Sequence, residues 1–459
     1  MSSTLRQRQV SPQAEADKAS AIIAAEEIEL TEGQKFLVPN FTIKQLLDAI
    51  PAHCYKRSAF KSSLYVVQDV ILLGALIYGA YHIESFLGRF ALSPIAFAAA
   101  QFTLWSAYIF SAGLVGTGIW VIAHEAGHQA YSPSKTINNS VGWVLHSFLL
   151  VPYHSWRISH GRHHAATGHL TRDEVFVPKT RSQLGIQPMK HESEDKGINV
   201  PAWRRAELYE ALGESPIASL WGLFLHQIFG WPMYLIRNAS GQKHYPRFTN
   251  HFQPSSIIFK TSQYWDIIIS DLGIAIMFSL LGFWTYNRGF KEVALVYGLP
   301  YLWDSFLLHK RQVLTFVVNH WLVAITFLQH TDPELPHYSE KEWTFARGAL
   351  ATVDREGGWI EKYILHRIVS THVAHHTSSR IPHYHGVEAT NALKAFLGPH
   401  YKHSDKNVFV EFYRIFRECR FIEDGHDIAF YKNMEGVAQK VGVIEGDVVS
   451  DSGVDGKDQ

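Results

Sequence analysis

The chain has 459 residues, in which 42 basic and 42 acidic side chains give a formal net charge of zero. A balanced charge leaves no electrostatic footprint for nucleic acid, so no nucleic-acid partner is expected. The two cysteines, Cys54 and Cys419, lie far apart and form no CxxC pair. Their number argues against a disulfide framework and thiolate zinc sites, and suits soluble parts that face the reducing cytosol.

Both ends of the chain are polar. Residues 1–34 are rich in charged and small polar side chains and lack an apolar segment of the length that a signal peptide needs. We expect 1–34 to be a disordered tail and 433–459 to be a mostly disordered C-terminal tail. A single domain is therefore predicted for residues 35–432.

Long apolar runs predict four transmembrane helices. The runs 63–87, 95–123 and 265–286 each reach the ~20 residues that cross the hydrocarbon core. A fourth crossing is predicted within 293–330. The first two spans and the last two are each joined by a short loop, which leaves a long polar stretch between the pairs.

Two further apolar segments, 141–153 and 217–236, are interrupted by proline, glycine and histidine. These interruptions favour helices that lie in the membrane interface over further spans.

The distribution of positive charge predicts the orientation. Lys56, Arg57 and Lys61 precede the first span, whereas the first short loop holds only Arg89. The excess of positive charge marks the cytosolic side, so the N-terminus is expected in the cytosol. An even number of crossings then places the central and C-terminal polar regions in the cytosol as well.

Three histidine motifs lie in these cytosolic regions, just outside the spans: HEAGH at 124–128, HGRHH at 160–164 and HVAHH at 372–376. On a helix the i, i+3 and i+4 positions share one face, with Cβ atoms about 5–6 Å apart. One such motif is more simply a solvated helix face, but three with similar spacing on the same side of the membrane favour metal binding. The candidate ligands are His124, His128, His160, His163, His164, His372, His375 and His376.

The first motif also matches HExxH, which is typical of zinc proteases with a glutamate base between two ligands. A zinc protease needs one further ligand, so the other two motifs would be left unused. Imidazole suits zinc, copper, iron and nickel alike, but eight candidates indicate two metal ions. A redox-capable pair beside an apolar, membrane-facing cavity suits oxygen activation and attack on hydrocarbon.

A histidine-rich metal transporter or another non-catalytic metal-binding membrane protein is the alternative from a different class. Transport requires polar or ionisable ligands near the middle of the bilayer. The three motifs flank the membrane instead, which argues against this alternative.

Beyond the histidine motifs, the sequence resembles the membrane fatty acid desaturases, in particular the fungal and plant delta-12 (oleoyl) branch. The similarity includes SFLLVPYHSWRISHGRHH at 147–164, FLQHTDPELPHY at 327–338 and THVAHH at 371–376. It covers about residues 35–432.

The resemblance implies an all-α integral membrane fold, in which four transmembrane helices carry a cytosolic helical cap that holds a di-iron site. It makes the eight motif histidines iron ligands and adds His330, in LQHT, as a ninth. An interfacial helix cap is the simpler alternative for His330. Asp173 and Asp354 are candidates to accept the second ring N–H of ligand histidines, although solvated caps are the favoured interpretation of both.

The activity implied is oxygen-dependent insertion of a cis double bond at delta-12 of an oleoyl chain, carried by phospholipid or coenzyme A, to give linoleoyl lipid. Glu125 follows the HExGH pattern of delta-12 enzymes and not the HDxGH pattern of omega-3 enzymes. An omega-3 or bifunctional desaturase and a lipid hydroxylase stay open. The chain has no flavin, nicotinamide or HPGG haem motif, so the resemblance implies cytochrome b5 and its reductase as electron donors, at the endoplasmic reticulum membrane.

One segment, 304–317 (DSFLLHKRQVLTFV), departs from the family pattern. It places Lys310 and Arg311 where the fourth helix should cross, and each charge at a helix centre costs about 2.5–3.5 kcal/mol. Without the segment, the flanking apolar residues join into a span of suitable length. Our hypothesis is that 304–317 is a retained intron or a gene-model error.

Overall fold

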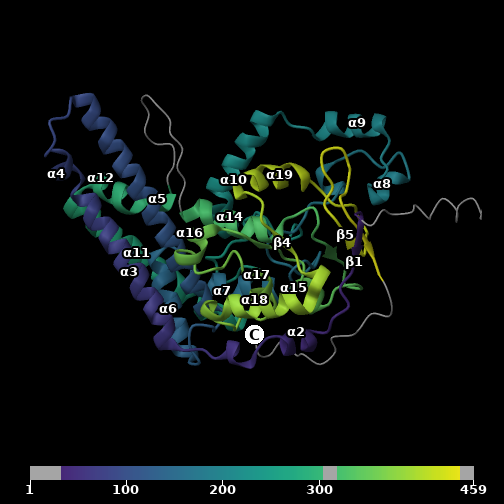
Figure 1. Cartoon of the computed structure of the whole chain (residues 1–459), viewed down its shortest axis with the longest axis horizontal. Coiled ribbons are helices and arrows are strands. Elements are labelled where there is room, and N and C mark those ends of the chain that lie inside the picture. The colour runs from purple at the N-terminus through teal and green to yellow at the C-terminus, as the bar shows by residue number, and fades with distance from the viewer. Residues whose placement is uncertain (1–32, 303–317, 445–459) are drawn as a thin grey trace, which may run out of the picture.

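The computed structural model describes residues 33–302 and 318–444. These residues are mostly helical and form two parts (Figure 1): an arm of long helices on the left and a body of shorter helices on the right. The predicted tail 1–34, except for its last two residues, and the segment 304–317 lie outside the described residues.

Three helices of the described part are long and apolar enough to cross a membrane. They are α3 (Ala59–Tyr81), α5 (Pro94–Gly127) and α11 (Tyr264–Arg288), which η3 (Thr261–Gln263) precedes. They confirm that the first three predicted spans are helices of sufficient length. In α5, 78% of the most apolar stretch is buried, against 11% in α3 and 17% in α11, so α5 is the inner helix of the arm.

Local sequence explains where the spans begin. Ser58 caps α3 and accepts a hydrogen bond from the Lys61 amide, and Ser93 caps α5 in the same way, with Pro94 at the first helical position. The short α4 (Ile83–Leu87) lies between these two spans.

The fourth predicted crossing is only partly described. Before the gap lie α12 (Phe290–Val293), a π-helical turn (Ala294–Gly298) and α13 (Leu299–Leu302), and after it lies α14 (Val318–His330). Helices α13 and α14 contact each other, and both contact α5. Whether the chain crosses the membrane here stays a prediction.

The body contains helices that precede the arm in the sequence, come between its spans or follow it. They are α2 (Ile43–Ala49), η1 (Ala52–Tyr55), α6 (Lys135–Phe148), α7 (Tyr153–Ala166), η2 (Ser182–Leu184), α8 (Ser193–Lys196), α9 (Ala202–Leu212), α10 (Pro216–Arg237), α15 (Phe345–Ala349), α16 (Gly358–Tyr363), α17 (His372–Thr377), α18 (His383–Leu397), η5 (Gly398–His400) and α19 (Val408–Glu418). Helices α6 and α10 confirm helical structure in the two segments predicted to be interfacial, and α10 is not among the candidate spans.

The body also contains three two-stranded β-ladders. The ladders are parallel β1 (Lys35–Leu37) with β6 (Val441–Val443), antiparallel β2 (His337–Tyr338) with β5 (Ile428–Ala429), and parallel β3 (Asp354–Arg355) with β4 (His403–Ser404). The β1–β6 ladder joins the two ends of the described chain. The structured domain therefore continues to Val443, past the boundary expected at residue 432, because backbone pairing orders a segment that its composition does not.

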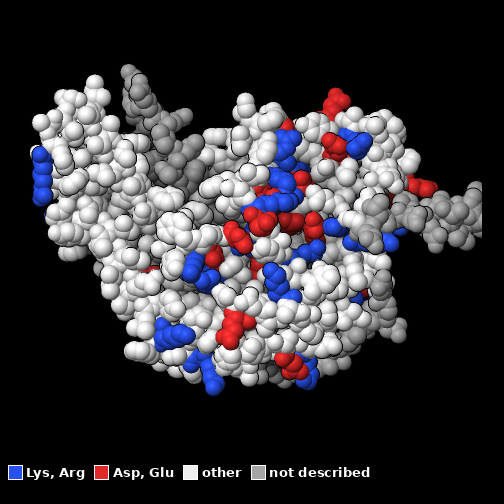
Figure 2. All heavy atoms as spheres, in the orientation of Figure 1, with Lys and Arg blue, Asp and Glu red and all other residues white. Residues whose placement is uncertain are grey.

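Side-chain chemistry separates the two parts. Figure 2 shows charged side chains gathered over the body, whereas the arm is almost free of them. Large apolar side chains of α3 and α11 are exposed, which is the pattern of surfaces that contact lipid. Examples are Leu64, Val67, Val70, Ile71, Leu272, Ile276, Phe278, Leu280 and Phe283.

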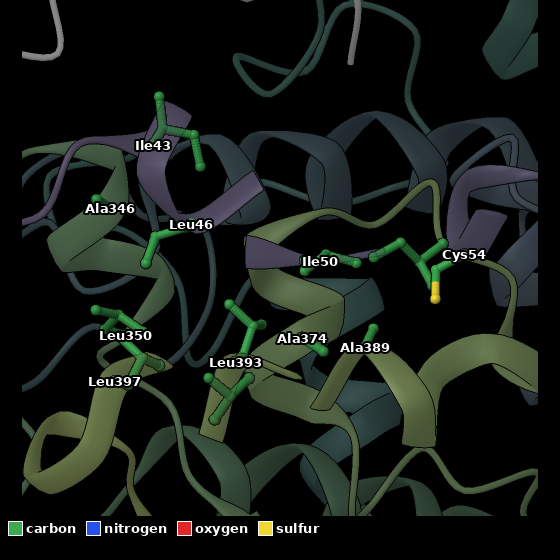
Figure 3. Packing of buried hydrophobic residues seen from close by; sticks show 12 residues of the cluster. Ile43, Leu46, Ile50, Cys54, Ala346, Leu350, Ala374, Ala389, Leu393 and Leu397 are labelled. Carbon is green, nitrogen blue, oxygen red and sulfur yellow. The ribbon is translucent and has the colours of Figure 1, made fainter. Parts of the chain in front are cut away.

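The body has its own apolar core, which α2, α15, α17 and α18 share (Figure 3). Leu46 of α2 and Leu393 of α18 are fully buried there. This core fixes α17, the helix that carries the third histidine motif, against its neighbours. The buried members are Ile43, Leu46, Ile50, Cys54, Ala346, Leu350, Val373, Ala374, Ile381, Ala389, Leu393 and Leu397.

Leu393→Ala is expected to lower the free energy of unfolding of the body by about 2–5 kcal/mol, because it removes buried methyl groups and leaves a cavity. The thermal unfolding midpoint of the purified protein measures this loss. Asn391→Ala, at an exposed position of the same helix, is the matched control and should leave the midpoint almost unchanged. Equal midpoints for the two variants would contradict the core assignment.

Candidate metal centre

The three histidine motifs lie on three different helices. The first occupies the C-terminal end of α5, where His124 is in the last turn and His128 is the C-cap residue. The second lies on α7 and the third on α17. His330 is the last residue of α14. The structure brings all nine predicted ligands together, and they divide into two groups.

The first group combines two i, i+4 pairs. In one pair His124 Nε2 lies 3.2 Å from His128 Nε2, and in the other His160 Nε2 lies 3.2 Å from His164 Nε2. One nitrogen of His375 joins them, and a donor atom from each of the five lies within 4.8 Å of the others. We call these residues the five-histidine group.

The second group is centred on His330. One nitrogen each from His163, His330 and His376 lies within 4.8 Å of the others. His330 Nε2 is 3.3 Å from His163 Nε2 and 2.9 Å from His372 Nε2. We call these four residues the four-histidine group. The contacts of His330 argue against its being only an interfacial helix cap.

Helix geometry explains how one HxxHH motif serves both groups. On α7, the i, i+4 pair His160 and His164 faces the five-histidine group, while His163 is rotated toward the other. On α17 the i, i+4 pair His372 and His376 faces the four-histidine group, and His375 faces the five-histidine group. The two groups are adjacent, as the rings of His164 and His376 stack with centroids 3.9 Å apart.

The spacing of the nitrogens fits metal coordination. Imidazole nitrogens about 2.0–2.1 Å from one metal, at angles of 90–110°, are about 3.0–3.4 Å apart. The measured Nε2–Nε2 separations lie close to this range. Nε2 of His375 and of His376 is buried and has no hydrogen-bond partner among the described residues, which a bound metal would provide. The donor set therefore fits two metal ions.

Burial also sets the protonation state of these candidate ligands. Loss of hydration lowers the pKa of His160, His164, His372, His375 and His376 well below its usual value, and neighbouring imidazoles lower it further. These side chains are therefore neutral near pH 7, and each keeps a lone pair for a metal.

Outer partners orient the rings. His163 Nδ1 lies 2.6 Å from Asp173 Oδ1, so its N–H donates to the carboxylate and Nε2 is free to face the group. Thr167 donates its hydroxyl to the His163 carbonyl and lies 3.1 Å from His376 Nδ1, whose N–H it can accept. Such partners fix the tautomer and the orientation of a metal-binding histidine.

Asp173 and Asp354 are not solvated caps, as the favoured interpretation of the sequence had them. Both are buried, with exposed fractions of 6% and 0%. Asp173 also accepts from the Gly168 and Val175 amides. Asp354 accepts from the Val373 amide at the start of α17 and from the Tyr401 hydroxyl. Asp354 therefore positions the third motif through its backbone, and burial raises the pKa of its carboxyl to about 6.

The glutamate of HExxH does not take the role of a protease base. Glu125 is buried, and its Oε2 accepts a hydrogen bond from the His383 amide at the start of α18. Its other oxygen lies 3.7 Å from His124 Nδ1 and 3.9 Å from His375 Nδ1, on the side of each ring away from Nε2. Glu125 is thus a neighbour of two ligand histidines and ties α5 to α18.

The end of α14 is fixed by an ion-pair network. Arg355 donates to the Leu328 carbonyl and to the carboxylates of Asp332 and Glu411. The Gln329 amide donates to the Ile368 and Val369 carbonyls that precede the third motif. These contacts hold His330 in place although α14 begins beside the undescribed segment.

Sequence patterns did not identify Thr167 or Arg355 as supporting residues. Thr167 lies three residues after the second motif, and Arg355 follows Asp354 in VDRE, 17 residues before the third motif. Their proximity to a motif is the only sequence signal, because each acts through a partner far away in the chain.

The comparisons with known proteins agree with this centre. The profile of the family described as fatty acid desaturase matches residues 102–406. A Delta(12) fatty acid desaturase of Mortierella alpina is 45% identical over 404 residues, which cover 87% of this chain and 92% of that protein. A Delta(12) fatty acid desaturase of Mortierella isabellina gives the same values. An oleate hydroxylase of Claviceps purpurea is 38% identical over 440 residues, 89% of this chain and 84% of that protein.

The chain therefore belongs to the fatty acid desaturase family, a family of oxidoreductases that act on lipid. This membership confirms the resemblance drawn from the sequence and excludes a transporter as its class.

Asp173→Asn is expected to weaken binding of a divalent metal by about 10–100-fold, because an amide does not hold His163 in the same tautomer. Metal titration of the purified, metal-depleted protein measures the change. Glu340→Gln is the matched control, since Glu340 pairs with His169, a histidine outside both groups, at 2.9 Å. Equal affinities for the two variants would show that Asp173 does not support a ligand.

Proposed function

We propose that the chain is an oxygen-dependent delta-12 desaturase that converts oleoyl lipid to linoleoyl lipid at a di-iron centre. The observation that carries the proposal is the pair of adjacent histidine groups at the ends of helices α5 and α14. The two Mortierella relatives, both Delta(12) fatty acid desaturases, supply the regiochemistry.

We assign one iron ion to the five-histidine group and one to the four-histidine group. When bound, the iron pair supplies the redox chemistry that lets dioxygen remove hydrogen from an unactivated C–H bond. In the overall reaction, the acyl chain loses one hydrogen atom from C12 and one from C13. With two electrons and two protons from outside, one O2 becomes two water molecules.

The protein's own residues hold and shield this centre. The neutral imidazoles present Nε2 inward, while Asp173 and Thr167 hold Nδ1 from behind. Two tryptophans cover the five-histidine group, because Trp120 stacks on His124 and Trp156 stacks on His160 with ring centroids 5.3 Å and 4.5 Å apart. Their apolar rings exclude water from that side of the centre.

For the membrane we propose four crossings, with the histidine motifs at the cytosolic face and the chain in the endoplasmic reticulum. The exposed apolar side chains of α3 and α11 support an arm within the bilayer, and the charges of the body support a part outside it (Figure 2). The positive residues before α3 support the cytosolic side. Helices α13 and α14 would together form the fourth crossing.

The two electrons must come from a separate protein, because the sequence has no flavin or nicotinamide fingerprint. We propose cytochrome b5 and its reductase as the donors, as the family resemblance implies. The acyl substrate is carried by phospholipid or by coenzyme A.

A lipid hydroxylase is the second candidate, because one relative is an oleate hydroxylase. The same centre would serve both reactions. They differ in whether the carbon radical in the acyl chain loses a second hydrogen or gains a hydroxyl. Identity favours the desaturase, at 45% against 38%.

Expression in a yeast that makes oleate and no linoleate is expected to yield linoleate. Two versions of the chain are compared, one complete and one without residues 304–317, and the fatty acids are analysed by gas chromatography and mass spectrometry. Product from only the shorter version would support the hypothesis of an erroneous insert. Hydroxylated or omega-3 products would replace the delta-12 assignment, and no new product from well-expressed protein would contradict oleate as substrate.

His330→Ala is expected to abolish desaturation and to lower bound iron from about two to about one per chain, because the four-histidine group loses its central ligand. Iron analysis of the purified protein and product analysis in yeast measure the two effects. His244→Ala removes an exposed histidine outside both groups and is the control. Full iron content with lost activity would make His330 a positioning residue and not a ligand.

A further inference from the structure

A second cluster of metal-binding side chains lies outside the nine-histidine centre. His53 and Cys54 are neighbours in η1 (Ala52–Tyr55), and His385 and Glu388 lie one turn apart on α18. One donor atom from each of the four lies within 4.8 Å of the others. No residue of this cluster belongs to the five- or four-histidine group.

The contacts within the cluster converge on one point. His53 Nε2 lies 2.6 Å from Glu388 Oε1 and 3.9 Å from Cys54 Sγ. His385 Nδ1 lies 3.6 Å from the other carboxylate oxygen of Glu388. An ion pair between His53 and Glu388 accounts for two of these side chains. The Cys54 thiol and the His385 ring also interact with the Glu388 carboxylate, so all four donors gather around one anionic group.

The donor set matches zinc. One thiolate, two imidazoles and one carboxylate are common ligands of a tetrahedral Zn²⁺ site, with bonds of about 2.0–2.3 Å. Adjacent donors in such a site are about 3.3–3.7 Å apart, so the observed separations require only small side-chain movements. Soft thiolate together with imidazole disfavours magnesium and calcium, which prefer oxygen.

The backbone around the cluster is well fixed on both sides. Cys54 is fully buried at the edge of the core that α2, α17 and α18 share (Figure 3). The Ser58 amide donates to the Tyr384 hydroxyl at 2.9 Å, which joins the start of α3 to the start of α18. Donors on rigid elements keep their geometry without metal, so little order has to be created on binding.

We propose that His53, Cys54, His385 and Glu388 bind a structural zinc ion that joins η1 to α18. The ion would connect the segment that leads into the first span with the helix that follows the third histidine motif. Since Glu125 also contacts the start of α18, through the His383 amide, the zinc site would stabilise the surroundings of the iron centre without sharing a ligand with it.

Cobalt replacement tests the site separately from the iron centre. Co²⁺ bound to a thiolate gives a near-ultraviolet charge-transfer band, and the nine-histidine centre has no thiolate. Metal-depleted wild-type chain titrated with Co²⁺ is expected to show this band, and because the two histidine groups also take up Co²⁺, the band should saturate by about three equivalents. Cys54→Ser should abolish the band, whereas Cys419→Ser, the matched control at the other cysteine, should retain it.

A second variant, at a half-exposed residue of the cluster, tests the site in case the Cys54 variant misfolds. Glu388 is half exposed, so Glu388→Gln is expected to fold and to bind zinc at least about 10-fold more weakly, since even outer partners of a metal contribute that much. No charge-transfer band in the wild type, a band that persists in Cys54→Ser, or unchanged zinc affinity in Glu388→Gln would each overturn the site. Linoleate formation reports on the iron centre independently.

Discussion

The structure depends on one demand: nine imidazoles, seven of them buried and two half-buried, must be held close together. Lone pairs about 3 Å apart repel, and buried nitrogens without hydrogen bonds cost free energy. A metal ion removes both penalties, so metal binding and the folding of this region are expected to be coupled. The surrounding contacts can be understood as the means of holding the rings in place before the metal arrives.

Those contacts act mainly on helix ends. Asp354 holds the start of α17, Glu125 joins α5 to the start of α18, and Arg355 holds the end of α14. Each partner comes from a different part of the chain. The nine histidines thus come together only when the arm and the body have packed together, because α5 belongs to the arm and α7 and α17 belong to the body.

Part of this arrangement could be predicted from the sequence. The i, i+4 spacing placed pairs such as His160 and His164 on one face, and hydropathy placed the first three spans. The assignment of His163 and His375 to the opposite groups could not be predicted, because it depends on the angle between α7 and α17. The burial of Asp173 and the β1–β6 ladder could not be predicted for a similar reason. The sequence around each resembles a solvated loop, and contacts with distant parts of the chain determine its structure.

Two bound metal ions would bring positive charge, which imidazole side chains alone do not offset. The carboxylate of Asp173 lies behind the His163 ring and would offset part of this charge. Helix ends offer more: α5, α7 and α14 each place a candidate ligand histidine in their last turn. The C-terminal end of a helix carries a partial negative charge, so three such ends around one centre favour cations. The motifs therefore select metal both by their nitrogens and by the helix ends on which they lie.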